Sequence, residues 1–298
     1  MAQIREIKKR IKSIESTKKV THAMELVAAA KMRKAQASAL SGRPYSLTLN
    51  QIIDEVRQKT DETSHTLLKK KQAPTQLIIL ITSDRGLAGG LNINLFREIL
   101  HLRGEKSPHL GGDQIIYITV GKKAVNFAAK SGAEIIASFA SEEKSPLDLA
   151  RTLSKMATDM FIKSQTNKVS ILYPHFESTT NQSPKWVQIL PIEFEASLTS
   201  EVKRDYTSEA SGQIDLLFEP NARKILSNIL PHYVQTQIYQ VLLEAKASEH
   251  SARMVAMKNA TDAAGDLIED LTLTYNQARQ EAITKELLDI ITAQKAFE

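Results

Sequence analysis

The segment whose spacing comes nearest to a known chemistry is glycine-rich and follows a short apolar run. Residues 83–92 read Ser-Asp-Arg-Gly-Leu-Ala-Gly-Gly-Leu-Asn and lie between an apolar stretch at 77–81 and a helical pattern. Backbone amides in such a loop can bind phosphate groups. A Walker loop, however, needs Gly-Lys-Ser/Thr at the helix start, and this chain has Gly90-Leu91-Asn92. Since Gly-x-Gly-x-x-Gly does not fit either, nucleotide binding is only a minor alternative.

Side chains that act as metal ligands or nucleophiles are not grouped in the sequence. The chain has no cysteine, which excludes disulfides, thiolate catalysis and zinc–thiolate sites. Its seven histidines form neither a His-x-x-x-His nor a His-Glu-x-x-His pair. Acidic pairs such as Glu142-Glu143 lie in charged runs, which are typical of solvent-exposed surface. The sequence therefore predicts no catalytic residue, no bound metal and no cofactor.

A basic cluster, Lys31-Met32-Arg33-Lys34, lies within a helical pattern. Such a cluster could bind nucleic acid, anionic lipid or an acidic protein surface, or it could simply face solvent. No Phe, Tyr or Trp occurs before Tyr45. This weakens the nucleic-acid interpretation, because proteins that bind single strands stack the bases on aromatic side chains.

Charge is unevenly distributed along the 298 residues, whose formal net charge is +5. Residues 1–36 hold ten Lys and Arg against three Glu, a net of +7. Residues 233–298 hold six Lys and Arg against ten Asp and Glu, a net of −4. The two ends of the chain are therefore electrostatically complementary. No stretch approaches the ~20 apolar residues of a membrane-spanning helix, so no direct membrane insertion is expected.

Both ends of the chain have helical periodicity over long distances, from residue 2 to 59 and from 221 to 297. In the first segment isoleucines at 4, 7, 11 and 14 define a heptad seam. Gly42 and Pro44 predict a kink in this first helical segment at those residues. The predicted seam then continues through Thr21, Met24, Val27, Ala28, Met32 and Ala35. The predicted stripe of the second segment runs through Ile238, Leu242, Ala245, Ala252, Ala256, Ala263, Leu267, Leu271, Thr274 and Ala278.

The two terminal helices are expected to pair with each other. The second would span on the order of 100 Å at ~1.5 Å per residue, too long to bury its stripe against a small globule. The pair is expected to be antiparallel, because both helices would leave the same side of the intervening domain. That domain alternates apolar runs at 77–81, 115–120, 134–139, 169–173 and 187–192 with helical patterns at 93–102, 122–130 and 146–163. Such alternation predicts an α/β fold with a mostly parallel sheet.

Three long stretches closely resemble the gamma subunit of bacterial F-type ATP synthases. The first is the opening helix, at 4–11 and 21–34, and the second is the loop at 83–92. The third is the C-terminal region, at 247–262 and 275–287. The three occur in the family's order, at both ends and in the middle of the chain. The resemblance implies α/β plus long helices: an antiparallel two-helix coiled coil of both termini with a central Rossmann-like domain. The expected parts are an N-terminal shaft helix at 1–59, the α/β domain at 74–195 and a C-terminal shaft helix at 214–298.

The resemblance also implies a function. The chain is expected to be a non-catalytic rotor shaft, which couples proton flow through a ring of c subunits to conformational changes at catalytic sites on the beta subunits. Its expected partners are the hexamer of alpha and beta subunits, the epsilon subunit and the rotor ring, with no nucleic acid. Its expected location is peripheral, at the cytoplasmic face of the bacterial inner membrane.

Specific residues match positions with known roles in that family. Six match contacts with the beta subunit: Lys31, Arg33, Arg85, Arg279, Gln280 and Thr284. Of these, Arg85 with Lys31 and Arg33 would face an acidic lever segment of beta. Met24 would pack against the C-terminal helix, and Phe218 and Glu219 would lie near the epsilon subunit and the rotor ring.

Two differences from the family limit which of its properties this chain is expected to share. Many relatives have cysteine where this chain has Ala88, and chloroplast versions carry an inserted cysteine pair that this chain lacks. Thiol regulation is therefore excluded, and a bacterial source is favoured. The alternative function is a coiled-coil scaffold or RNA-binding arm protein with a non-catalytic α/β domain, which predicts an affinity for RNA that falls steeply with salt.

Overall fold

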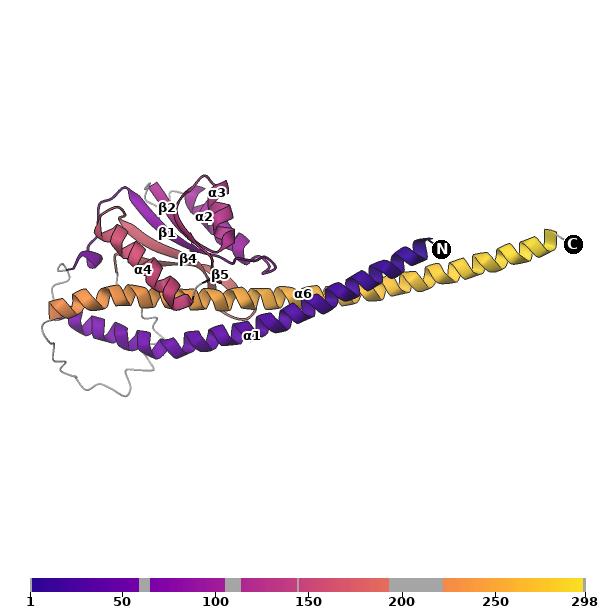
Figure 1. Cartoon of the computed structure of the whole chain (residues 1–298), viewed down its shortest axis with the longest axis horizontal. Coiled ribbons are helices and arrows are strands. Elements are labelled where there is room, and N and C mark those ends of the chain that lie inside the picture. The colour runs from indigo at the N-terminus through magenta and orange to yellow at the C-terminus, as the bar shows by residue number, and fades with distance from the viewer. Residues whose placement is uncertain (1, 59–64, 105–113, 144, 193–221, 297–298) are drawn as a thin grey trace.

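The computed structural model describes residues 2–58, 65–104, 114–143, 145–192 and 222–296. Two helices, α1 (Ala2–Gln58) and α6 (Ala222–Ala296), dominate the shape. They lie side by side, run in opposite directions, and carry both chain ends far from the α/β body (Figure 1). At about 1.5 Å per residue, the 75 residues of α6 span roughly 110 Å. Both helices continue through their internal prolines, Pro44 and Pro231.

Contacts between α1 and α6 show their antiparallel register. The Thr261 hydroxyl donates to the Thr21 hydroxyl at 2.8 Å. Nearer the body, the Tyr45 ring meets the His232 ring edge-on, with 5.9 Å between centroids. As residue numbers rise along α1, those of their partners on α6 fall, which is the order that antiparallel helices require.

The contact face of each helix repeats every seven residues. The seam of α1 consists of side chains that are at least partly shielded at intervals of three and four: Ile4, Ile7, Ile11, Ile14, Lys18, Thr21, Glu25, Ala28, Met32 and Ala35. Past the α/β body, α6 has a matching seam: Met257, Thr261, Ala264, Ile268, Leu271, Tyr275, Ala278 and Ala282. Alternating spacings of three and four are those of helices that wrap around each other.

Part of the predicted stripes is wrong. Val27, Ala263, Leu267 and Thr274 are exposed and lie outside the seams. The reason is that α6 is covered from two sides beside the body, by α1 and by the sheet with α4, so its apolar residues there do not mark a single face. Of the predicted stripe past Ala256, Leu271 and Ala278 lie in the seam, whereas Ala263, Leu267 and Thr274 lie outside it.

The α/β body is built on a five-stranded sheet in the order β3-β2-β1-β4-β5. Its strands are β1 (Thr75–Ile81), β2 (Gln114–Val120), β3 (Glu134–Phe139), β4 (Lys168–Phe176) and β5 (Gln182–Leu190). The first four are parallel, and β5 runs antiparallel to β4. The central strand β1 is buried on both faces, so its sequence is continuously apolar after Gln76.

Helices cover both faces of the sheet. On one face α2 (Leu91–Gly104) and α3 (Lys122–Lys130) enclose a small core around Ile78, Leu80 and Tyr117. On the other face α4 (Pro146–Ile162) and the two long helices enclose the larger core, which contains Leu77 and Ile79. This second core fixes the body to the base of the helix pair (Figure 1).

The predicted strands and helices of the body occur within a few residues of their expected positions, with one exception. The last strand starts at Gln182 and not at 187, and Pro184 lies inside it. An edge strand tolerates proline because one row of its amides needs no partner in the sheet. The connector predicted at 60–73 contains a short 3₁₀ helix, η2 (Thr66–Leu68), in its described part. No helix in the described ranges is long and apolar enough to cross a membrane.

Candidate functional site

The carboxyl-edge loop, residues 83–90, follows β1 at the edge of the sheet where parallel α/β folds bind ligands. The Ser83 hydroxyl donates to the backbone oxygen of Arg85 at 2.7 Å and accepts from the Asn92 amide at 2.8 Å. The Asp84 carboxylate accepts from the backbone N–H groups of Lys122 and Glu142, each at 3.0 Å. The Asp84 carboxylate therefore links the carboxyl-edge loop to the loop that ends at Lys122 and to the loop that contains Glu142.

This loop geometry does not fit a phosphate. The amide of Lys122 opens α3 and is already bound to Asp84, whose negative charge would repel a phosphate in the same place. Gly121 has φ 95°, and a Cβ on it would lie 2.2 Å from the backbone oxygen of Thr82. Glycine is needed at this position because α3 starts in direct contact with β1.

The loop presents Arg85 to solvent. Its side chain is 77% exposed, and its guanidinium lies 3.4 Å from the Glu142 carboxylate. Exposed ion pairs of this kind contribute only ~0–1 kcal/mol, so Arg85 can exchange Glu142 for another carboxylate at little cost. Leu87, with φ 62°, is also exposed on the loop.

A buried ion pair anchors the loop on α6. One Arg253 nitrogen lies 2.7 Å from the Glu249 carboxylate and donates to the backbone oxygen of Gly86 at 3.5 Å. Both side chains are only 10% exposed. Burial raises the pKa of Glu249, and Arg253 opposes that shift. Sequence reasoning missed this pair, although Glu and Arg four residues apart on a helix are a recognisable signal.

Cationic side chains of both long helices lie near the carboxyl-edge loop. Lys31 of α1 lies near enough to α6 to act electrostatically on Lys246 and His250. Burial, followed by the positive charges of Arg253, Lys31 and Lys246, lowers the pKa of His250 to about 4. Asp84 and Glu142 also act on Lys246. The structure thus brings Lys31 into the electrostatic surroundings of the loop that carries Arg85.

The remaining predicted residues lie in different surroundings. Arg33 is exposed two positions beyond Lys31, and Met24 is half-buried one turn from the Thr21–Thr261 contact. Arg279, Gln280 and Thr284 are exposed on the distal part of α6, where the Thr284 hydroxyl donates to the Gln280 backbone oxygen at 2.9 Å. Phe218 and Glu219 lie outside the described residues.

The tip of α6 extends beyond the end of α1 (Figure 1). Every residue from 283 to 292 is exposed. Its exposed apolar side chains are Ile283, Leu287, Leu288, Ile290 and Ile291. Exposed apolar surface of this extent marks a region that contacts another molecule.

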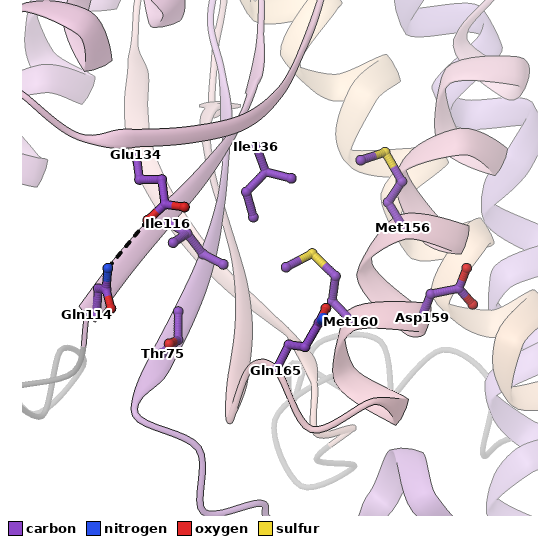
Figure 2. A pocket seen from close by; sticks show the side chains of 9 residues that line it. All are labelled: Thr75, Gln114, Ile116, Glu134, Ile136, Met156, Asp159, Met160 and Gln165. Carbon is purple, nitrogen blue, oxygen red and sulfur yellow. Dashed lines mark hydrogen bonds between the residues drawn. The ribbon is translucent and has the colours of Figure 1, made fainter.

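A groove at the opposite, amino-terminal edge of the sheet has a volume of about 700 Å³. Figure 2 shows Met160 of α4 reaching toward Ile116 and Ile136 of the sheet, with Glu134 and Asp159 on the two sides. Glu134 accepts from the Gln114 amide at 3.4 Å. In the described part of the chain no three His, Asp or Glu side chains are placed to hold a metal ion.

Comparisons with known proteins agree with this architecture. Residues 3–297 match the family described as ATP synthase. The ATP synthase gamma chain of Opitutus terrae is 38% identical over 99% of both chains, and that of Methylacidiphilum infernorum is 38% identical over the full length of both.

Solved structures with the same fold share less sequence. A chain in the OSCP, F1 and c-ring structure of the Euglena gracilis mitochondrial ATP synthase has a TM-score of 0.66 and 19% identity, over 99% of this chain and 95% of that one. A chain of the central stalk and c-ring of the Tetrahymena thermophila mitochondrial ATP synthase has a TM-score of 0.58 and 21% identity, over 81% of this chain and 99% of that one. With a full-length family match and close relatives over the whole length, the chain belongs to the family of ATP synthase gamma chains.

Proposed function

We propose that this chain is the central rotor shaft of an F-type ATP synthase and has no catalytic site of its own. The observation that carries the proposal is the antiparallel pair of helices, whose α6 tip continues past α1 into an exposed apolar end. A paired rod of this length has no role in a compact enzyme, but it suits a part that turns inside a ring of other subunits. The gamma-chain relatives support the same role.

The shaft is proposed to be a two-helix coiled coil attached to a Rossmann-like domain. The heptad seams of α1 and α6 support the coiled coil, and the parallel β1–β4 sheet with helices on both faces supports the domain. Along the chain this corresponds to parts at 1–59, 74–195 and 214–298. A coiled coil resists twisting better than a single helix, which torque transmission requires.

Two surfaces are proposed to contact the beta subunits within the hexamer of alpha and beta. The lower surface consists of Arg85, Lys31 and Arg33, whose cationic side chains would meet an acidic segment of beta. The upper surface consists of Arg279, Gln280 and Thr284, all exposed on α6. Met24 is proposed to pack between the two helices close to the lower surface.

Coupling would arise from the asymmetry of the shaft. Arg85 and the carboxyl-edge loop project from one side of the helix pair only, so each orientation brings them against a different beta subunit. A shaft that binds one beta conformation better than another shifts that subunit's population, by an amount set by the difference in binding free energy. One rotation then takes each catalytic site through all its states, driven by proton flow through the ring of c subunits.

The base of the shaft is proposed to contact the epsilon subunit and the ring of c subunits, with Phe218 and Glu219 in that region. The Tetrahymena thermophila neighbour belongs to a central stalk and c-ring assembly, which supports this arrangement. The chain would then be a peripheral protein at the cytoplasmic face of the bacterial inner membrane.

Co-expression with the alpha and beta subunits of the same organism tests the function. ATPase activity is expected from the purified complex that contains this chain, whereas alpha and beta without it should give far less. Equilibrium dialysis of the isolated chain against ATP should show no binding. If the chain instead purified with RNA at low salt and without alpha and beta, the RNA-binding scaffold would be the better account.

A further inference from the structure

A second cavity, of about 330 Å³, lies between the two long helices beside Phe176, the last residue of β4. Ala39 and Leu40 of α1, Ala247 of α6 and Phe176 form the apolar part of its lining, and Gln36 of α1 and Gln240 of α6 add amide groups. The cavity exists because alanines on both helices fill little of the space between the helix axes. It belongs to neither proposed beta-contact surface.

One carboxylate lies in this partly apolar cavity. Glu244 of α6 is the only charged side chain in its lining, and it is 28% exposed. The Tyr173 hydroxyl donates to one of its oxygens at 2.8 Å, and the His175 Nδ1 lies 2.5 Å from the other. Burial and the charge of Glu244 raise the pKa of Tyr173, so the hydroxyl keeps its proton. Glu244 is therefore held in one orientation by two side chains of β4.

A purely apolar molecule does not satisfy this cavity well. Its volume exceeds what a single water molecule needs, and an organic occupant would displace water from the apolar part of the lining. A purely apolar occupant would leave the carboxylate without a counter-ion, because His175 neutralises Glu244 only when it is protonated. An occupant with one positive charge and a small apolar body would satisfy both features.

We propose that this cavity binds a small organic cation, with its ammonium group on Glu244 and a single apolar ring against Ala39, Ala247 and Phe176. A volume of about 330 Å³ is at the lower end of the range of small-molecule sites, which suits a ligand of that size. The ligand contacts α1, α6 and β4 together. Binding therefore stabilises the packing of the helix pair against the α/β body.

The test compares two probes that differ in charge. The full chain is titrated with 2-phenylethylamine and with 2-phenylethanol by isothermal titration calorimetry at about pH 8. The amine is expected to bind with a dissociation constant of about 1 mM or tighter, at least about tenfold tighter than the alcohol. Glu244→Gln should abolish that preference. Ala39→Leu, which fills the cavity, should abolish binding of both probes.

The matched control is Glu134→Gln, which removes a carboxylate from the groove at the amino-terminal edge and should leave amine binding unchanged. Circular dichroism checks that each variant folds. If Ala39→Leu does not fold, Leu40→Trp blocks the cavity from a position that is 55% exposed and tolerates a larger side chain. Equal affinity for the two probes, undiminished binding to the filled variant, or no measurable binding of the amine would each overturn the proposal.

Discussion

The hydroxyl oxygens of Thr21 and Thr261 lie 2.8 Å apart, in a hydrogen bond between residues 240 positions apart in the sequence. Thr21 in turn donates to the backbone oxygen of Lys18 at 3.0 Å. Neighbouring seam residues on α6 are Met257 and Ala264, which have no such polar group. The two threonines can satisfy each other in one register only, so they specify how the long helices align.

Removing one of these hydroxyls is expected to destabilise the helix pair. Thr21→Val takes away one of two acceptors of the Thr261 hydroxyl, the other being the Met257 backbone oxygen at 2.8 Å, and should lower the free energy of unfolding by about 1 kcal/mol or less, measured in urea. The double variant Thr21→Val/Thr261→Val should lose less than the sum of the single losses, because neither hydroxyl is then left without its partner. Thr272→Val, an exposed threonine on the same helix, is the control and should change little. Additive losses would mean that the two hydroxyls do not interact.

Much of the fold could be predicted from the sequence because its signals are local. The isoleucines at 4, 7, 11 and 14 state the seam of α1 directly, and the continuous apolar run of β1 marks a strand covered on both faces. The course of α6 past Ala256 could not be predicted equally well. Which of its faces meets α1 depends on where the sheet stops covering the helix, and that is a tertiary property.

The candidate surfaces were predictable to a smaller extent. Arg85 and the distal residues of α6 are exposed, and their contacts with another subunit stay predictions. The Glu249–Arg253 pair has a recognisable spacing of four residues on one helix, but its burial depends on the fold. The Asp84 contacts with Lys122 and Glu142 join loops far apart in sequence. No periodicity or motif encodes such contacts, so only the structure reveals them.

The stability of the chain is expected to fall in mild acid because of His250. Its pKa is about 4 in the folded chain against 6.5 for the free side chain, chiefly because of burial. Between these two values the unfolded chain takes up a proton that the folded chain does not, so stability declines as the pH drops from 6.5 to 4. Urea midpoints measured across this range should decline less in His250→Gln. A variant with the same slope as the parent would show that His250 is not the group responsible.

Reversing the charge of Arg85 is expected to weaken coupling in the assembled complex. Arg85→Glu would place a negative charge against the proposed acidic segment of beta, so ATP-driven proton pumping should fall relative to ATP hydrolysis. The matched control is Arg151→Glu, because Arg151 is also an exposed arginine but lies on α4, away from both proposed surfaces. Normal pumping and synthesis with Arg85→Glu would contradict the electrostatic account of this contact.

A proline inside α6 is expected to reduce the activity of the complex more than removal of the C-terminal residues of that helix. Ala256→Pro removes a backbone hydrogen bond inside α6 where it pairs with α1, at a cost of about 3 kcal/mol or more. Deletion of residues 293–298 leaves the paired region intact. ATPase activity of the complex with alpha and beta is therefore expected to fall much further with the proline than with the deletion. Equal losses would argue against the helix pair as the mechanical element.

The central claim is that the two terminal helices turn together as one shaft, and a reversible cross-link between them tests it most directly. Because the chain has no cysteine, Thr21→Cys/Thr261→Cys introduces a single pair whose side chains replace hydroxyls 2.8 Å apart. The measurement is ATP hydrolysis by the complex with alpha and beta, before and after oxidation and again after reduction. The account predicts that the disulfide forms and that hydrolysis stays close to that of the reduced complex. Failure of the pair to cross-link, or inhibition on oxidation that reductant reverses, would contradict it.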